Sequence, residues 1–281
     1  MQQLSELTLK APHEKSPAEN QRRDYSRLWL ALVMISLIGL TIVSFTQFDT
    51  KGVDIPEAAL ASLNNIRVMF QELRLSHISL QTALINVLIT FSLALITTFI
   101  AALISFFLAL LAAKNFSSGL MSNIVKGLVA FIRAVPTVLW VLIFAISAGL
   151  GAEACVMGLC FHAVGYLTKA YSEVIEEMDM GPVEALRASG ASFWQVVFQG
   201  VLPSVLSYFL AWTFMRFEIN YMAAIAMGAA AGAGGIGFDL FMSGSFYYDI
   251  REVGAITVII LLSVLLLEIV SVRLKRRLQS S

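Results

Sequence analysis

Residues 78–113 contain no charged side chain, and no other feature of this sequence constrains the fold as strongly. As one α-helix this stretch would be roughly 54 Å long, whereas the hydrocarbon core of a bilayer is about 30 Å thick. Part of it must therefore tilt, lie on the membrane surface or project beyond the bilayer. The whole chain is 58% hydrophobic and 14% charged, which is outside the range of soluble domains. The sequence predicts an all-α, polytopic membrane protein.

Hydropathy predicts about six transmembrane helices. They lie at residues 28–48, 78–113, 124–150, 154–171, 204–227 and 253–272. The apolar run of the first is too long for a cleaved signal peptide, so we expect it to remain as a span. Pro136 is expected to kink the third span. Because the sequence shows no internal repeat, one membrane domain is the simplest interpretation.

Lysine and arginine side chains gather at both ends of the chain, in residues 1–27 and 273–281. Six spans place both ends on one side, and the positive-inside rule makes that side cytoplasmic. We expect residues 1–27 to be a mobile cytoplasmic arm and residues 274–281 a basic cytoplasmic tail. Residues 49–77 then form an extracytoplasmic segment, and the apolar spacing within 58–75 predicts a helix at the outer interface.

The polar segment between the fourth and fifth predicted spans has the pattern of two short helices joined by a tight turn. Pro182 suits the first turn of a helix, because its missing N–H is not needed there. Glu184 faces the positive end of the helix dipole, and Gly190 suits the position just past the helix end. Ser192 and Gln195 have the spacing of a capping box that starts the second helix. A protein does not need such a surface to stay in the membrane, so we expect a partner to dock on it.

The second short helix is expected to end before Pro203, because proline interrupts a helix interior. The sequence Glu184-Ala185-Leu186, followed by Gly190 and Leu202-Pro203, resembles the "EAA" loop of ABC-importer permeases. In that family the loop is where a cytoplasmic ATPase grips the membrane subunit. The alternative is an ordinary amphipathic loop on the membrane surface. The resemblance implies a coupling loop at residues 173–203, with Glu184, Ala185, Leu186, Arg187, Gly190, Leu202 and Pro203 as coupling residues.

Other stretches resemble permeases of the phosphonate-import branch of ABC transporters, from roughly residue 80 to the C-terminus. They are residues 108–115, residues 133–136 with Trp140, residues 216–220 and residues 232–238. The chain departs from the usual patterns at Gly200 and at Met222, where many phosphonate permeases have arginine. The resemblance implies a type I, MetI-like permease core at residues 78–273, preceded by an additional first transmembrane helix at 28–48.

The resemblance also implies function and partners. The function would be ATP-driven import of phosphonates or related phosphorus oxyanions across a bacterial inner membrane. The partners would be an ABC ATPase dimer that binds ATP and Mg, an extracytoplasmic substrate-binding protein, membrane lipid, and a second permease copy or a paralogous permease. Three alternatives stay open: a permease for amino acids or methionine, a secondary transporter, and a membrane scaffold. A secondary transporter predicts paired charges near the midplane and inverted repeats, whereas this chain has one sparse charged patch and no repeat.

Arg216 and Glu218 are the most unusual charges, because ionised groups inside a membrane are costly and usually functional. Arg216 and Asn220 are four residues apart and share a helix face. All three are candidates for the translocation path, but a structural role, with Arg216 paired to a carboxylate of another helix, is equally open. We expect His162 to be a hydrogen-bonded core residue rather than a proton carrier, and Arg133 to be an anchor near the cytoplasmic boundary.

A glycine-rich segment follows the fifth predicted span. Gly232-x-Gly234-x-x-Gly237 formally matches the dinucleotide-binding fingerprint, but that fingerprint requires a soluble βαβ unit. We expect these glycines and Gly235 to form a close-packed, re-entrant turn instead. The family resemblance implies that this turn forms the outer part of the translocation path.

Several motifs are absent from the sequence. There is no G-x-x-x-x-G-K-[ST] phosphate loop, so ATP hydrolysis must come from a separate chain. His13-Glu14 lacks the second histidine of a zincin, and no G-x-S-x-G elbow occurs. Cys155 and Cys160 lie in an apolar run and are expected to be packing residues. We therefore expect no enzymatic active site, bound cofactor or metal, and the neutral net charge argues against nucleic-acid binding.

Overall fold

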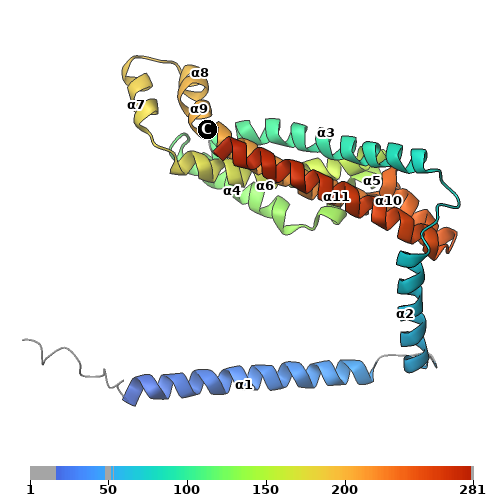
Figure 1. Ribbon diagram of the computed structural model, residues 1–281. Helices are drawn as coiled ribbons and strands as arrows, with labels where there is room; N and C mark the ends of the chain where they lie inside the picture. The colour runs from blue at the N-terminus through green and yellow to red at the C-terminus, as the bar shows by residue number, and fades with distance from the viewer. Residues whose placement is uncertain (1–16, 48–51, 53, 280–281) are drawn as a thin grey trace, which may run out of the picture. The chain divides into compact units, whose positions relative to one another are not determined.

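The computed structural model describes residues 17–47, 52 and 54–279, and every regular element in these ranges is helical (Figure 1). The chain divides into two units, residues 1–60 and 61–281. The first unit contains α1 (Pro17–Thr46) and the start of α2 (Ile55–Gln71). Because α1 begins at Pro17, the last part of the predicted N-terminal arm is helical, while residues 1–16 lie outside the described residues. The described side chains of α1 are all exposed, as expected of a helix that faces lipid.

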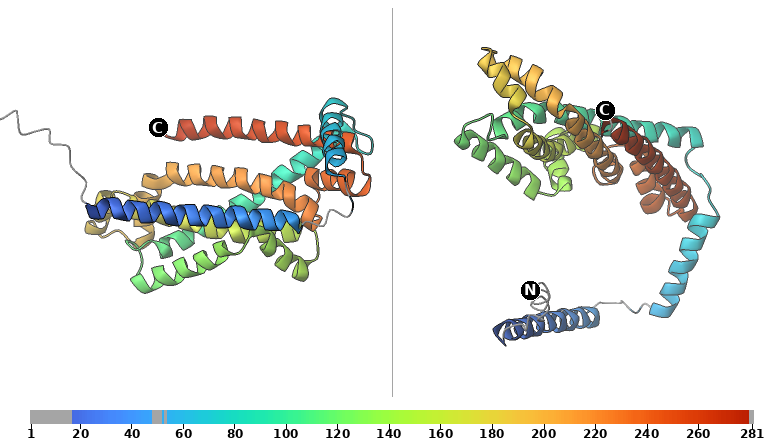
Figure 2. Two further views of the ribbon diagram at one scale, coloured as in Figure 1. Left: turned by 90° about the horizontal axis from the view of Figure 1, so that it is seen from below. Right: turned by 60° about the vertical axis from the view of Figure 1, so that its left-hand side comes forward.

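The second unit is a helical bundle with α6 at its centre (Figures 1 and 2). The helix α6 packs against α3, α4, α5 and α9, and α11 runs along α9. A short hairpin, α7–α8, projects from one end of the bundle, and the C-terminal end of α11 lies at this same end. The elements are α3 (Leu80–Ala112), α4 (Gly119–Ala134), α5 (Thr137–Ala148), α6 (Ala152–Glu177), α7 (Gly181–Ala188), α8 (Phe193–Val196), the π-helix η1 (Val197–Val201), α9 (Leu202–Ala231), α10 (Gly235–Phe241), the π-helix η2 (Met242–Phe246) and α11 (Ile250–Gln279).

The long helix α3 shows how this bundle packs. Ser79 caps its first turn by accepting a hydrogen bond from the backbone N–H of Thr82 at 3.1 Å. Its buried positions are mostly small residues, among them Ala94, Ala101 and Ala109, whereas most of its large apolar side chains are exposed. Small residues let helix backbones approach closely where lipid gives no hydrophobic driving force. This pattern explains why a stretch that is apolar all round still has one packed face.

The kink predicted at Pro136 in the span at residues 124–150 is confirmed, and it is sharp enough to break the helix. Two helices, α4 and α5, replace it, and they meet at an angle of 91°. Pro136 removes a backbone donor and forces the preceding Val135 into an extended conformation, with φ −89° and ψ 127°. The indole N–H of Trp140 donates to the carbonyl of Ile132 at 3.0 Å, which satisfies one of the acceptors left free at the end of α4.

Four helices in the described residues are long and apolar enough to cross a membrane, or five if α4 and α5 count as one broken span. The central helix α6 is not among them. With 26 residues it is long enough, but His162 and the four charged side chains of its second half make it more polar. His162 is part-buried, whereas Lys169 and Glu173 are about half exposed. Polar groups on a central helix of a membrane bundle indicate a functional site.

Close packing at glycine gives the first testable prediction. A Cβ atom on Gly237 of α10 would overlap the backbone oxygen of Ile225 in α9. We expect Gly237→Ala to destabilise the protein by about 1–3 kcal/mol or more, because backbone cannot move aside as a side chain can. Thermal unfolding of the detergent-solubilised protein measures this loss. Gly127→Ala in α4 is the matched control, because nothing lies within 4 Å of its added methyl group. Equal melting temperatures for the two variants would contradict the described packing of α10.

Candidate functional site

The hairpin forms as two short helices, and its first helix α7 begins as predicted. Pro182 lies in the first turn, and Asp179 accepts a hydrogen bond from the backbone N–H of Gly181 at 3.0 Å. Glu184 also lies in the first turn, where the helix dipole favours a negative charge. Val183 is fully buried, whereas Glu184 and Ala185 are exposed. One face of α7 therefore anchors the hairpin, and the opposite face is free for a partner.

Gly190 ends α7 in the manner that its sequence position predicts. Its φ is +81°, in the left-handed region. Its N–H donates to the carbonyl of Arg187 at 3.0 Å, and the N–H of Ala191 donates to the carbonyl of Leu186 at 3.0 Å. These two bonds form a Schellman motif. The capping box of α8 also forms, with Gln195 Oε1 accepting from the N–H of Ser192 at 2.7 Å. The turn between the two helices is thus fixed by backbone geometry.

The prediction that Pro203 ends the second helix is wrong. The chain passes from α8 through η1 directly into α9, and Pro203 occupies the first turn of α9. In η1 the N–H of Leu202 bonds to the carbonyl of Val197, five residues back. The wider π-helical turn accommodates the proline ring, which in an α-helix would clash with the carbonyl four residues before it. The hairpin is therefore continuous with a long helix of the bundle.

A buried cluster ties the base of the hairpin to the bundle. It contains Val183, Val196, Val197, Val201 and Val205, with Leu186 packed against it. A Cβ atom on Gly200 would lie 3.0 Å from the Leu186 side chain, so a small residue at 200 lets α7 pack closely. The Arg187 guanidinium lies over the Phe116 ring, 5.3 Å from its centroid. Phe193, Trp194 and Phe198 are about half exposed on the outer side.

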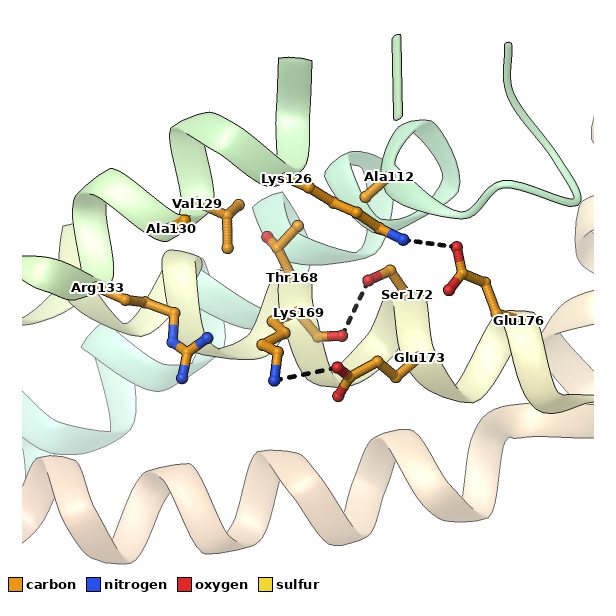
Figure 3. Close-up of a pocket in the computed structure, with 10 residues that line it drawn as sticks. All are labelled: Ala112, Lys126, Val129, Ala130, Arg133, Thr168, Lys169, Ser172, Glu173 and Glu176. Carbon is orange, nitrogen blue, oxygen red and sulfur yellow. Dashed lines mark hydrogen bonds and ion pairs between the residues drawn. The ribbon is translucent and has the colours of Figure 1, made fainter. Parts of the chain in front are cut away.

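One ion pair joins α4 to α6, and a second lies along α6 (Figure 3). Lys126 Nζ lies 2.8 Å from Glu176 Oε1, which also accepts the backbone N–H of Lys114 at 2.8 Å. Lys169 and Glu173 pair along α6 at 3.1 Å. These groups line a cavity of about 190 Å³ between α4 and α6. The junction of α3 and α4 is thereby tied to the end of α6 from which the hairpin leaves.

Arg216 and Asn220 lie one turn apart on α9 and contact different helices. The Asn220 amide donates to Thr98 Oγ1 of α3 at 2.9 Å. Arg216 Nη2 lies 3.1 Å from His162 Nδ1 of α6, and its guanidinium is 5.3 Å from the centroid of the Tyr166 ring. Arg216 is only 2% exposed and Asn220 is fully buried. Glu218, the third candidate, is half-buried.

The glycine-rich segment makes a sharp turn between α9 and α10. Gly232, Gly234 and Gly235 all have positive φ values, of 62°, 77° and 69°. Gly235 lies against Thr90 of α3, whose hydroxyl oxygen accepts the N–H of Ile236 at 3.1 Å. Gly237 packs on the backbone of α9. These contacts match the expected close-packed turn and place it at the end of the bundle opposite the hairpin.

A second polar cluster at that opposite end was missed from the sequence. Glu252 of α11 is fully buried, and its Oε1 accepts three backbone N–H groups, those of residues 76–78, at 2.8–3.2 Å. Its Oε2 lies 2.6 Å from His77 Nδ1 and accepts the Ser243 hydroxyl at 3.1 Å. The hydrogen bond from Ser76 Oγ lowers the pKa of the Asp249 carboxyl, which precedes α11. Because both of its oxygens accept hydrogen bonds from other segments, Glu252 acts as a clasp between them.

The family described as "Binding-protein-dependent transport system inner membrane component" matches residues 105–281. The chain belongs to this family. It is therefore a transport component and a multi-pass protein of the inner membrane. The match covers the hairpin, the buried arginine and the glycine-rich turn.

Curated relatives agree with this assignment. The chain is 38% identical over 159 residues to the phosphite transport system permease protein PtxC of Stutzerimonas stutzeri, which covers 56% of this chain and 57% of that protein. It is 29% identical over 210 residues to the phosphate-import permease protein PhnE of Mycolicibacterium smegmatis, covering 71% of this chain and 37% of that protein. It is 36% identical over 120 residues to the putative cryptic phosphonate transport system permease protein PhnE2 of Escherichia coli, covering 43% and 97%. The first two matches thus span about half or less of those relatives' length.

Solved structures support the fold. The inward-facing MetNI methionine ABC transporter matches with a TM-score of 0.64 at 20% identity, over 73% of this chain and 99% of that chain. A bacterial ABC transporter involved in import of the polysaccharide alginate matches with a TM-score of 0.59 at 15% identity, over 92% and 99%. At these identities the likeness concerns the fold alone, and the fold is that of a type I importer permease.

Proposed function

We propose that this chain is the membrane-spanning permease subunit of an ATP-driven ABC importer for phosphonates, phosphite or related phosphorus oxyanions. The observation that carries the proposal is the hairpin of α7 and α8, where likeness to the EAA loop coincides with a rigid base and exposed Glu184 and Ala185. The names of the relatives from S. stutzeri and E. coli support the substrate class.

The proposed partners follow from the family to which the chain belongs. An ATPase dimer, which holds ATP and Mg, docks on the hairpins of two permease chains. The second permease is another copy of this chain or a paralogue. A substrate-binding protein delivers the solute at the bundle end that carries the glycine-rich turn. In this arrangement the chain translocates solute and leaves ATP hydrolysis to its partner.

The proposed orientation places the hairpin in the cytoplasm. Basic residues are concentrated at both ends of the chain, and the C-terminal end of α11 lies at the same end of the bundle as the hairpin. The positive-inside rule then supports a cytoplasmic side for the hairpin and both termini.

Coupling follows from how the hairpin is held. ATP binding closes the ATPase dimer, and the docked hairpins move with it. Because η1 continues into α9 without interruption, and the ion pair of Lys126 with Glu176 ties α4 to α6, the movement is passed to the helices that carry the buried polar groups. Access to the path switches from one side of the membrane to the other.

An uptake experiment tests the proposal. Cells that express the chain with its neighbouring ATPase and binding protein are given labelled methylphosphonate or phosphite, with unlabelled phosphate, sulfate and amino acids as competitors. We expect ATP-dependent uptake that phosphorus oxyanions block and amino acids do not. Uptake blocked by amino acids would replace the substrate assignment, and uptake abolished by a proton ionophore but not by ATP depletion would replace the mechanism.

A further inference from the structure

Arg216 is a buried cation inside the helical bundle. This side chain is 2% exposed, yet in the described residues no carboxylate forms an ion pair with it. Its two close contacts, the His162 imidazole and the Tyr166 ring, are uncharged groups, and its Nε has no hydrogen-bond partner among the described atoms. A buried cation is costly unless an anion compensates it. The structure therefore has a buried positive charge with a free donor.

A second arginine, Arg133, packs on the same helix, α6. A Cβ atom on Gly165 would lie 3.2 Å from Arg133 Cγ, so the end of α4 rests on α6 one turn from His162. Gly165 lies about halfway along the 26 residues of α6, so Arg133 packs against the middle of this helix. Figure 3 shows its guanidinium apart from the Lys126–Glu176 and Lys169–Glu173 pairs, and no ion pair involves it in the part of the chain described.

The open face of α6 connects these groups. His162, Tyr166 and Lys169 recur at helical spacing and remain half-buried or exposed, while Ala163 and Leu167 beside them are buried. An exposed arginine without an ion pair beside the middle of α6 is expected to face water or a partner chain, because contact with lipid is too costly. The face is thus suited to line an aqueous path.

The donors available on this face select an anion. A guanidinium has donors only, so His162 Nδ1 accepts the bond from Arg216 and the other ring nitrogen, Nε2, carries the proton. Arg216 Nε, the Arg133 fork and His162 Nε2 are then all donors. The carboxylates on the neighbouring turns of α6, Glu173 and Glu176, are each paired with a lysine, so they do not offer a site for the ammonium group of an amino acid.

We propose that Arg216, Arg133 and His162 form a site for a small oxyanion partway along the translocation path. This proposal rests on the function proposed above and names the residues that would distinguish an oxyanion from a zwitterion. Arginine forks match the oxygens of phosphonate or phosphite in a bidentate manner. The Tyr166 ring lies 5.3 Å from the Arg216 guanidinium, and this cation–π contact helps to orient the arginine.

A charge-sensitive cysteine reporter tests the site without measuring transport. Tyr166→Cys is made in the assembled permease–ATPase complex with Cys155→Ala and Cys160→Ala. We compare its reaction rates with an anionic sulfonatoethyl and a cationic trimethylammonium-ethyl methanethiosulfonate. We expect the anionic reagent to react about tenfold faster after correction for intrinsic reactivity, because a focused positive potential raises local anion concentration. Millimolar phosphite should slow its reaction.

Charge removal gives the decisive comparison. Arg216→Gln or Arg133→Gln should lower the rate ratio at least about threefold. Arg251→Gln is the matched control. Arg251 pairs with Glu72 at 2.8 Å, and both side chains are about half exposed. Its removal should leave the ratio of reagent rates unchanged. Three results would each overturn the site. They are a ratio of reagent rates near one, a ratio unchanged by the substitutions at Arg216 and Arg133, and an introduced cysteine that does not react at all.

Transport measurements separate this proposal from the proposed function. In proteoliposomes with the binding protein, Arg216→Met should lower phosphorus-oxyanion uptake about tenfold or more while ATPase activity persists, and Arg216→Lys should retain part of it. If the Arg216→Met variant fails to assemble, Arg133→Met replaces it in the uptake measurement, because Arg133 is exposed. If both methionine variants take up phosphorus oxyanions at the wild-type rate, the anion site is overturned but the proposed function is not. If the wild-type protein takes up no phosphorus oxyanion but the ratio of reagent rates still depends on the two arginines, the proposed function is overturned. The anion site then stays supported.

Discussion

Gly190→Pro is expected to abolish coupled uptake while the ATPase keeps hydrolysing ATP. Proline fixes φ near −65°, whereas Gly190 has φ +81°, and proline also removes the N–H that donates to Arg187. Forced backbone strain of about 1–3 kcal/mol and a lost hydrogen bond of about 1 kcal/mol together disfavour the turn. At about 1.4 kcal/mol per tenfold, the formed hairpin becomes roughly 30-fold to 1000-fold less populated. Uptake and ATPase activity measured in the same proteoliposomes report the effect.

Two substitutions at the same position serve as controls. Nothing lies within 4 Å of a Cβ atom added to Gly190, so a side chain fits there. The effect of a substitution on uptake therefore depends only on whether the new residue adopts the left-handed backbone conformation. Asparagine visits the left-handed region more easily than other residues, so Gly190→Asn should keep most of the uptake. Gly190→Ala should lie between the two. If the proline variant transports like the wild type, the turn of the hairpin does not take part in coupling.

The hairpin could be predicted from the sequence because its signals are local. Pro182, Glu184, Gly190 and the capping box each act within one or two turns of themselves, and each lies where the sequence indicates. The prediction for Pro203 was wrong because it also used local signals alone. Whether a proline ends a helix depends on the turn before it, and a π-helical turn has no sequence signal of its own.

The buried contacts could be predicted only in part. An arginine within a predicted span marks Arg216 as unusual, but its partner His162 is 54 residues away and is set by the register of α6 against α9. No local pattern fixes that register. The clasp around Glu252 joins positions more than 170 residues apart and uses backbone donors, which every residue except proline offers, so sequence could not indicate it.

Glu252→Leu is expected to cause a large loss of stability at the end of the bundle opposite the hairpin. Leucine would leave the three backbone N–H groups of residues 76–78 without their acceptor, and would also remove the partner of His77 and Ser243. Removing one member of a buried, charge-assisted network costs about 3–5 kcal/mol. For a chain of this size each kcal/mol lowers the melting temperature by about 2–4 °C. Thermal unfolding of the detergent-solubilised protein should therefore show a fall of roughly 6–20 °C.

Matched acidic substitutions separate the clasp from a general effect of charge. Glu252→Gln keeps an oxygen that can accept the backbone donors, so it should lose clearly less than the leucine variant. Glu72→Gln removes an equal charge from the Arg251 pair, whose side chains are about half exposed, and should cost no more than about 1 kcal/mol. The clasp holds the segment before α3 against the start of α11, beside the Ser243 that follows α10. If Glu252→Leu melts like Glu72→Gln, the segment is held by its apolar contacts alone, and Glu252 is free for another role.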